Sequence, residues 1–416
     1  MRSKLPPALH SPDFSLLWVG LLTEGFGTQM VAVAVGWQVF AINRSAFDLG
    51  LVGLFEFLPL LLLSLPAGQL ADHVSRKLVL AGAIGISGLV ALGLLGVTIG
   101  GADQLWPFLV LAAGNGVAMA IGSPAGRALG PMLVPWELLP SALALRSIAF
   151  QTGTVAGPAL GGLLFSIKPE LTYVVAAVMM LVGGIAVLLI HEPPFEGTGQ
   201  APSWGTFLAG VHFIRRTPVM LGAITLDLFA VLLGGATALL PLFARDILHT
   251  GPVGLGILRS APAVGALVAG IVLTRHPVGG SRTGAKLLIV VGAFGLATIV
   301  FGLSKSLPLS VAALAVAGGV DMVSVNIRST IAIVAAPNEL RGRVTAVESV
   351  FISASNELGA FESGVAASLL GAVPAVVAGG AITVVLAVVW RWVFPDLAHI
   401  DRIDELRPEP APVGLS

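Results

Sequence analysis

The chain has 416 residues, of which 56% are hydrophobic and 11% are charged, against roughly 25% charged residues in a typical water-soluble domain. Its 22 basic residues balance its 22 acidic residues, so it lacks the basic excess with which proteins bind nucleic acid. It has no cysteine, which excludes disulfides, thiolate metal sites and cysteine nucleophiles. These numbers predict an integral membrane protein.

The chain begins with twelve residues, MRSKLPPALHSP, that are polar and interrupted by prolines. A signal peptide passes from its basic start directly into an apolar segment, so we expect no cleaved leader. A helix crosses the hydrocarbon core of a bilayer with roughly 20 apolar residues. Twelve apolar runs of that kind follow, approximately at residues 16–42, 49–71, 78–99, 105–122, 138–165, 171–190, 218–243, 252–274, 286–304, 307–328, 344–370 and 373–394.

The longest segment outside these runs, residues 191–218, separates the sixth run from the seventh. Its second part, 204–216, is expected to form an amphipathic helix at the membrane interface. Lysine and arginine gather in alternate short loops, which places both termini in the cytoplasm under the positive-inside rule. The expected organisation is a six-helix bundle over 1–190, a cytoplasmic linker over 191–217, a second six-helix bundle over 218–395 and a cytoplasmic tail over 396–416.

The two halves of the chain repeat one another. Segment 134–148, VPWELLPSALALRSI, is similar to segment 336–350, APNELRGRVTAVESV, at an offset of 202 residues. An offset of 203 relates Glu24 to Asp227, and such agreement in chain order indicates a duplication. Two six-helix halves of the same orientation resemble the major facilitator superfamily. The resemblance implies an all-α membrane protein with twelve transmembrane helices in two pseudo-symmetric six-helix bundles.

The loop after the second run, GQLADHVSRK, resembles the signature that this superfamily carries between its second and third helices. The resemblance implies a gating loop, in which Asp72 lies near the N-terminus of the eleventh helix, where the helix dipole favours a carboxylate. The alternative is a basic loop that only fixes the orientation of the protein. The matching residues are Gly68, Asp72, Arg76 and Lys77.

Segment 153–162 of the fifth run reads GTVAGPALGG. Glycines four residues apart lie on one helix face and let a second backbone approach, while a proline bends the helix. The alternative without a transport role is a packing seam with a kink. The segment resembles the superfamily's antiporter motif, which implies export of a substrate in exchange for protons. The matching residues are Gly153, Gly157, Pro158, Gly161 and Gly162.

Three further segments indicate a branch of the superfamily. Segments 123–145, 213–220 and 336–344 resemble the branch of the enterobactin exporter and related transmembrane secretion effectors. The resemblance implies that the substrate is a siderophore, a macrolide or another amphiphile. The fourth run has no arginine at its middle, so the proton relay that many drug exporters route through that arginine is absent.

Ionisable residues within the apolar runs cost at least ~2.5–3.5 kcal/mol on insertion scales and mark a pathway or a partner. Glu24 and Asp227 are expected to face one another across the pseudo-two-fold axis. Glu56 and Arg259, of opposite sign at near-equivalent positions, suggest a polar contact between the halves. The proton-coupling candidates are Glu24 and Asp227, followed by Glu56, Asp321 and Glu357; each has a structural role as its alternative. The substrate-cavity candidates are Arg259, Phe26, Phe55 and Phe229, the aromatics having core packing as their alternative.

The chain contains no HExxH, GxSxG or P-loop sequence, so we expect neither an enzyme nor a metal or other cofactor. The sequence favours a multi-pass transporter of the inner or plasma membrane, and the resemblance to the major facilitator superfamily implies a monomer. Its expected partners are a small-molecule substrate, protons and membrane lipid, and no nucleic acid. The alternatives are an importer or uniporter of a small nutrient and a non-transporting membrane sensor.

Overall fold

The computed structural model describes residues 6–191, 204–276, 280–337 and 340–406, and of residues 64–65, 67–73, 204 and 206–207 it describes the backbone only. All regular secondary structure in these ranges is helical. The long helices up to residue 191 are α1 (Pro12–Asn43), α2 (Ala46–His73), α3 (Arg76–Ile99), α4 (Trp106–Met132), α5 (Leu139–Ile167) and α6 (Pro169–Leu188).

Helix α7 (Trp204–Arg216) covers the residues for which an amphipathic helix is expected. The helices that follow are α8 (Pro218–Gly234), α10 (Gly251–Arg275), α11 (Thr283–Leu303), α12 (Leu307–Ala335), α13 (Arg341–Leu370) and α14 (Ala372–Val393). The shorter elements are η1 (Pro7–His10), η2 (Trp136–Leu138), η3 (Thr237–Leu239), α9 (Leu240–Leu242), the π-helix η4 (Phe243–Ile247), α15 (Pro395–Ala398) and η5 (Ile403–Leu406).

Prolines help to set where these helices begin. α1, α6 and α8 each start with proline, whose fixed φ suits the first turn and whose missing N–H would have no partner there. Among the described residues, 11 helical segments are long and apolar enough to cross a membrane. Helix α13 covers the remaining predicted run but is not among them, since it carries glutamates at 348, 357 and 362.

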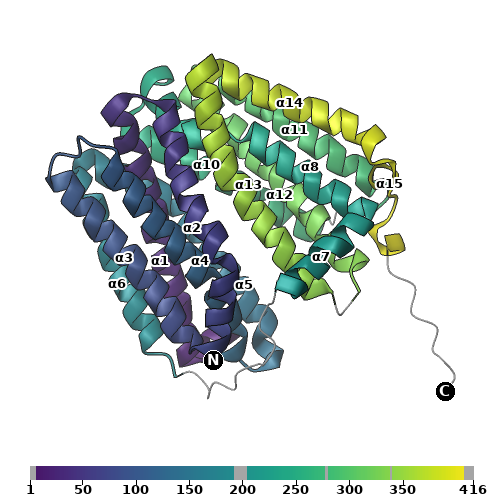
Figure 1. The fold of residues 1–416 in the computed structure, drawn as a ribbon, viewed down its shortest axis with the longest axis horizontal. Helices are drawn as coiled ribbons and strands as arrows, with labels where there is room; N and C mark the ends of the chain where they lie inside the picture. Colours follow the sequence, from purple (N-terminus) through teal and green to yellow (C-terminus); the bar gives the residue numbers. More distant parts are fainter. Residues whose placement is uncertain (1–5, 192–203, 277–279, 338–339, 407–416) are drawn as a thin grey trace.

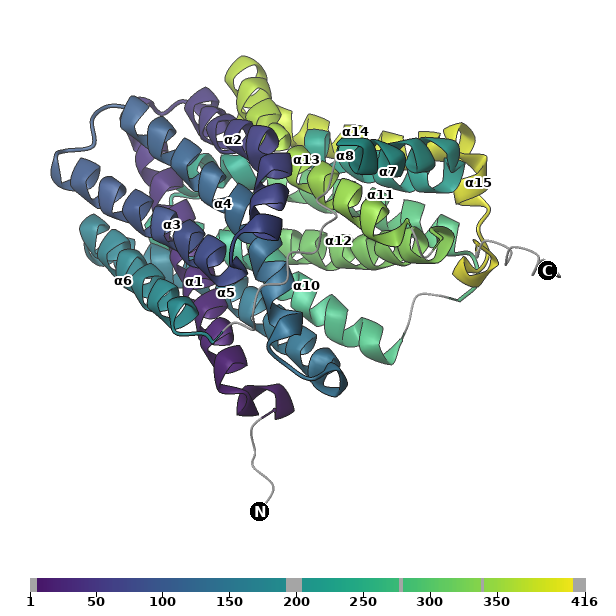
Figure 2. The same ribbon diagram turned by 60° about the horizontal axis from the view of Figure 1, so that its bottom comes forward.

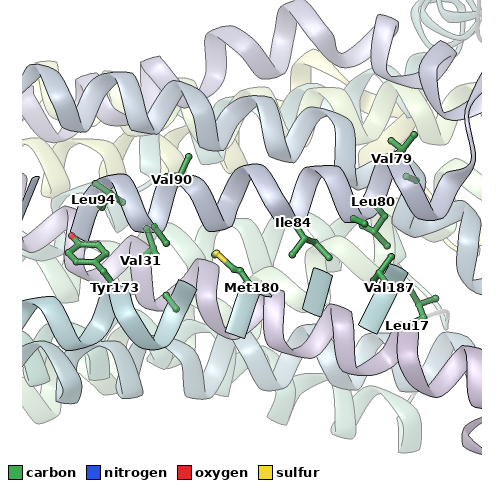
Figure 3. Packing of buried hydrophobic residues seen from close by; sticks show 14 of the residues in the cluster. Leu17, Val31, Val79, Leu80, Ile84, Val90, Leu94, Tyr173, Met180 and Val187 are labelled. Atoms are coloured by element: carbon green, nitrogen blue, oxygen red, sulfur yellow. The ribbon is translucent and has the colours of Figure 1, made fainter. Parts of the chain in front are cut away.

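The helices form two groups that lie side by side, α1–α6 and α8–α14 (Figures 1 and 2). In the first group α1 packs on α5 and α6, while α3 packs on α4 and α6. In the second group α10 packs on α12, and α11 packs on α12 and α14. Figure 3 shows the core between α1, α3 and α6, where Val31, Ile84, Met180 and Val187 interdigitate. Apolar packing of this kind holds each group together.

The groups meet mainly through two helix pairs, α2 with α13 and α5 with α10. Both pairs make close contacts at one end of the molecule, which also holds residues 44–45, 168 and 248–250; we call it the tight end. A Cβ added at Gly364 would lie 2.7 Å from the Cα of Gly50, so this approach of α13 to α2 requires glycine at position 364. Toward the opposite end, which holds η1 and α7, helices α2 and α13 diverge (Figures 1 and 2). We call this the terminal end.

The tight end also carries charged and aromatic contacts between the groups. The guanidinium of Arg245, in η4, lies 5.6 Å from the ring centroid of Trp37 in α1, within reach of a cation–π interaction. The exposed Arg44 and Asp246 lie 3.9 Å apart. The rings of Phe47 and Phe361 are 6.2 Å apart between their centroids.

Candidate functional site

A cavity of about 330 Å³ lies between the two groups of helices. Residues of α1, α2, α3 and α4 line it from the first group, and residues of η3, α9, α10 and α13 line it from the second. Much of the lining is apolar, as is usual for ligand pockets, with a few polar groups among it. The polar and charged lining residues are Thr28, Glu56, Asn115, Thr237, Arg259, Asn356 and Glu357.

Glu56 is fixed on the first-group wall of this cavity. The amide Nδ2 of Asn115 in α4 donates a hydrogen bond to Glu56 Oε1 at 3.0 Å. Helices α2 and α4 are in close contact here, so that a Cβ at Gly116 would press on the backbone of Glu56. Asn115 therefore holds the Glu56 carboxylate at the cavity wall. The bond takes Oε1 of Glu56 and does not involve Oε2.

Arg259 reaches across the cavity from α10. Its Nη1 donates to the backbone carbonyl of Ala32 in α1 at 3.1 Å, a bond that links the two groups. The charges of Glu56 and Glu357 both act on this guanidinium. Arg259 forms no salt bridge within 4.0 Å in the part of the chain that the structure describes. The structure thus brings Glu56 and Arg259 into one cavity, and adds Glu357 of α13 to them.

A second charged cluster lies within the second group alone. Asp227 of α8 and Arg328 of α12 form a salt bridge of 2.6 Å, with side chains only 10% and 4% exposed. Arg328 Nε also donates to Ser324 Oγ at 3.2 Å. Asp321 and Glu348 are close enough for their charges to interact with this pair. We call Asp227, Asp321, Arg328 and Glu348 the buried cluster.

The two leading sequence candidates therefore have different surroundings. Asp227 contacts Arg328 of its own group rather than Glu24 across the axis. Glu24 is half-buried in α1, and among the described residues it has no hydrogen-bond or ion-pair partner. Neither residue lines the cavity between the groups.

The glycines of segment 153–162 are all buried and bring α5 against two neighbours. Toward α1, a Cβ at Gly153 would lie 3.0 Å from the carbonyl carbon of Gly25, and Gly157 and Gly161 meet α1 in the same way. Toward α10, a Cβ at Gly162 would lie 3.2 Å from the Cα of Gly256. One segment therefore packs inside the first group and also against the second group at the tight end.

The residues expected to form a gating loop are only partly described. Only the backbone of Gly68 and Asp72 is described, so the expected position of the Asp72 carboxylate near the eleventh helix stays a prediction. Lys77 Nζ donates to the carbonyl of Ile190 at 2.8 Å, beyond the end of α6. Arg76 contacts the sulfur of Met132 at the end of α4. Both of these contacts lie within the first group.

Of the expected cavity residues, Arg259 lines the cavity and the three aromatics do not. Phe229 packs edge-on against Trp390 of α14, with 5.9 Å between ring centroids. Phe26 lies where α1 meets Gly153 of α5, and Phe55 is absent from the lining. The aromatic side chain that does line the cavity is Phe108. Sequence position alone could not distinguish these phenylalanines, because each lies in an apolar run.

Two asparagines that line the cavity were not among the residues predicted from the sequence. Asn115 and Asn356 are uncharged, so a search for ionisable residues passes over them, although a polar residue in an apolar run is itself a signal. The sequence reasoning also missed residues 237–241, where the helical run after Gly234 breaks and Thr237 and Pro241 reach the cavity. A break in a membrane helix is tolerated where it lines a cavity.

The comparisons with known proteins agree with this architecture. Residues 3–413 match a family described as transmembrane secretion effector. The multidrug efflux pump Tap of Mycolicibacterium fortuitum is 28% identical over 385 residues, which cover 86% of this chain and 89% of the relative. The enterobactin exporter EntS of Shigella dysenteriae serotype 1 is 25% identical over 394 residues, which cover 93% of each chain.

Solved structures of similar shape are transporters. A bacterial homolog of the human lysosomal transporter Spinster, inward-facing and unoccupied, has a TM-score of 0.75 at 17% identity, covering 98% of this chain and 100% of that one. A bacterial homologue of the iron transporter ferroportin in an inward-facing state has a TM-score of 0.69 at 16% identity, covering 93% and 99%. At these identities the likeness is one of fold.

Proposed function

Because the chain belongs to the transmembrane secretion effector family of the major facilitator superfamily, we propose that it is a proton-coupled exporter of small amphiphiles. Its substrates are drugs, macrolides or siderophores, moved by alternating access. The relatives named as efflux pump and exporter support the outward direction of transport. The protein acts as a monomer in the inner or plasma membrane.

In this proposal α13 is the twelfth membrane-spanning helix, although its charges make it less apolar than the other segments. Its contacts with α2, α8 and α14 support a place inside the bundle rather than on the surface. The two six-helix bundles comprise residues 1–190 and 218–395. The linker 191–217, which contains α7, and the tail 396–416 are cytoplasmic, as are both termini.

The contacts between the groups support an arrangement that is closed at the tight end. Glycine-mediated contacts of α2 with α13 and of α5 with α10 seal that end, and Trp37 and Arg245 lie across it. With the termini in the cytoplasm, the tight end faces the outside. Export then requires these contacts to separate after the terminal end has closed.

The cavity between the groups is the observation that carries the proposal. Its lining includes the Arg259 guanidinium and two carboxylates whose charges act on it, Glu56 and Glu357, contributed by three helices of both groups. A carboxylate that exchanges a proton as its surroundings change is what proton antiport requires. A cationic amphiphile that binds beside Glu357 competes with the proton for this carboxylate, which couples the two movements.

The test uses the purified protein in liposomes that contain a pH-sensitive dye. Addition of ethidium, a cationic amphiphile, is expected to release a proton current that Glu357→Gln abolishes. Matched variants Glu56→Gln, Glu24→Gln, Asp227→Asn and Asp321→Asn locate the proton carrier among the remaining carboxylates. The exposed Glu137→Gln is the control and is expected to behave like the wild type. Ethidium movement without proton movement in the wild type would leave a uniporter and contradict the coupling.

A further inference from the structure

The charged residues of the central cavity define the charge that a ligand meets there. Among the described lining residues, those that are ionisable are Glu56, Arg259 and Glu357, and all three are half-buried. With both carboxylates ionised, they carry two negative charges and one positive charge, a net charge of −1. The buried cluster of the second group contributes no residue to this lining. A ligand in the cavity therefore meets one unbalanced negative charge.

The two carboxylates come from opposite groups and approach the same helix wall. A Cβ at Gly53 of α2 would lie 3.7 Å from Glu357 Oε2, so the carboxylate of α13 reaches the first group. Glu56 follows Gly53 by three residues, which places the two positions on one face of α2. The charges of Glu56 and Glu357 act on each other. This part of the cavity therefore suits a cation.

Arg259 is held beside α1. Its Nη1 donates to the carbonyl of Ala32 at 3.1 Å, and a Cβ at Gly36 would lie 3.9 Å from the same nitrogen. In the described part of the chain, no carboxylate oxygen lies within 4.0 Å of this guanidinium. The backbone carbonyl thus fixes Arg259 while both glutamates stay free of a direct ion pair with it. Arg259 offsets one negative charge without occupying either carboxylate.

Building on the proposed function, we propose that Arg259 sets the charge of the substrate at +1 and the exchange at one proton per substrate cation, so that transport is electroneutral. With a monovalent cation bound, the two glutamates balance the cation and Arg259. With a proton on one glutamate instead, the cavity is neutral again. The empty cavity with both carboxylates ionised keeps a lone charge, which is costly to enclose within a membrane protein. The two neutral forms therefore pass most readily through the closed state between the two orientations.

The same balance narrows the substrate class to monovalent cationic amphiphiles. A divalent cation would leave one positive charge uncompensated, and an anion would add to the negative charge. The cavity volume of about 330 Å³ lies within the range of ligand pockets, about 300–1,000 Å³. Val31, Leu94 and Phe108 of the first group give it apolar surface for the rest of the molecule.

The first test measures equilibrium binding to the whole protein in nanodiscs of phosphatidylcholine. Ethidium carries one positive charge, while propidium and methyl viologen carry two. Propidium is larger than ethidium and methyl viologen is smaller, so the effects of charge and size are separated. Ethidium and propidium are followed by fluorescence, and methyl viologen by displacement of ethidium. The wild type is expected to bind ethidium at least about tenfold more tightly than either dication, because the uncompensated charge opposes the dication.

The variants change the charge of the cavity. Arg259→Gln makes the net charge more negative, so the affinity for both dications relative to ethidium should rise at least about tenfold. Arg259→Lys keeps the charge and the preference for ethidium, and the exposed Arg391→Gln on α14, outside the cavity lining, is the matched control. If Arg259→Gln does not fold, Asn356→Asp adds a carboxylate of similar size to the lining and should shift the preference in the same direction. An unchanged preference in Asn356→Asp, or in a folded Arg259→Gln, overturns the proposal.

The second test measures transport in liposomes that contain a pH-sensitive dye, under potassium diffusion potentials set with valinomycin. One proton is expected to move per ethidium, and reversing the potential should change the initial rate less than about twofold, since net charge crossing a membrane responds to the potential. Proton-coupled ethidium transport that depends strongly on the potential overturns this inference and leaves the proposed function standing. Ethidium movement without protons contradicts the proposed function, and the binding test then still decides whether Arg259 selects the charge.

Discussion

The buried cluster and the central cavity both bring an arginine together with carboxylates, yet their arrangements differ. In the buried cluster Arg328 pairs at 2.6 Å with Asp227, and both partners belong to one group of helices. In the cavity Arg259 binds a backbone carbonyl of the other group and has two carboxylates near it. A buried pair with both charges compensated suits a structural role. The charged residues of the cavity come from both groups of helices, which must separate during transport. This arrangement suits a role in the transport cycle.

The largest expected effect comes from breaking the buried pair. Arg328→Gln leaves Asp227 as an uncompensated buried charge, which typically destabilises a protein by about 3–5 kcal/mol. Thermal unfolding in detergent measures the loss. The double variant Asp227→Asn with Arg328→Gln is expected to recover most of the stability, because no lone charge remains. A single variant as stable as the wild type would contradict a structural role for the pair.

A smaller effect on stability but a large effect on function is expected for Glu357→Gln. The substitution keeps the shape of the side chain, and the residue lines a cavity, so the unfolding temperature should stay near that of the wild type. Proton-coupled ethidium transport should fall at least about tenfold, since a group positioned for proton transfer typically contributes 10²–10⁴-fold. Equal losses of stability and of transport would place Glu357 with the structural residues.

Asn115→Ala sharpens the comparison within the cavity. It removes the hydrogen bond to Glu56, whose net contribution to stability is about 1 kcal/mol. Transport is expected to decrease less than in Glu357→Gln, because the Glu56 carboxylate remains but is no longer held in place. The double variant Asn115→Ala with Glu56→Gln should be no worse than Glu56→Gln alone. Additive losses would mean that the amide acts independently of the carboxylate.

The smallest effect is expected at the surface pair of the tight end. Arg44 and Asp246 are 3.9 Å apart, with side chains 65% and 36% exposed. Solvent and salt screen such a pair, so Asp246→Asn should change stability by less than about 1 kcal/mol. Unfolding measured at low and high salt checks this value, and a larger loss at both would indicate that the pair is a stronger link between the groups.

The sequence by itself determined the membrane class and the approximate positions of most helices, although the seventh predicted run breaks after Gly234. Apolar runs of bilayer length leave a chain few choices other than helices, since backbone groups in lipid must bond within their own segment. The glycine spacing in segment 153–162 likewise predicted a close helix contact, and the structure has it on both faces of α5.

The partners of the charged residues were decided only by the tertiary structure. Glu56 and Arg259, near-equivalent in the repeat, both line the cavity, but the repeat could not show that their hydrogen-bond partners are Asn115 and Ala32. Asp227 finds Arg328 one hundred and one residues away, a contact that depends on how α8 and α12 pack. Which side of a membrane helix faces a cavity depends on its rotation about its own axis. That rotation is set by neighbouring helices rather than by the apolar run itself.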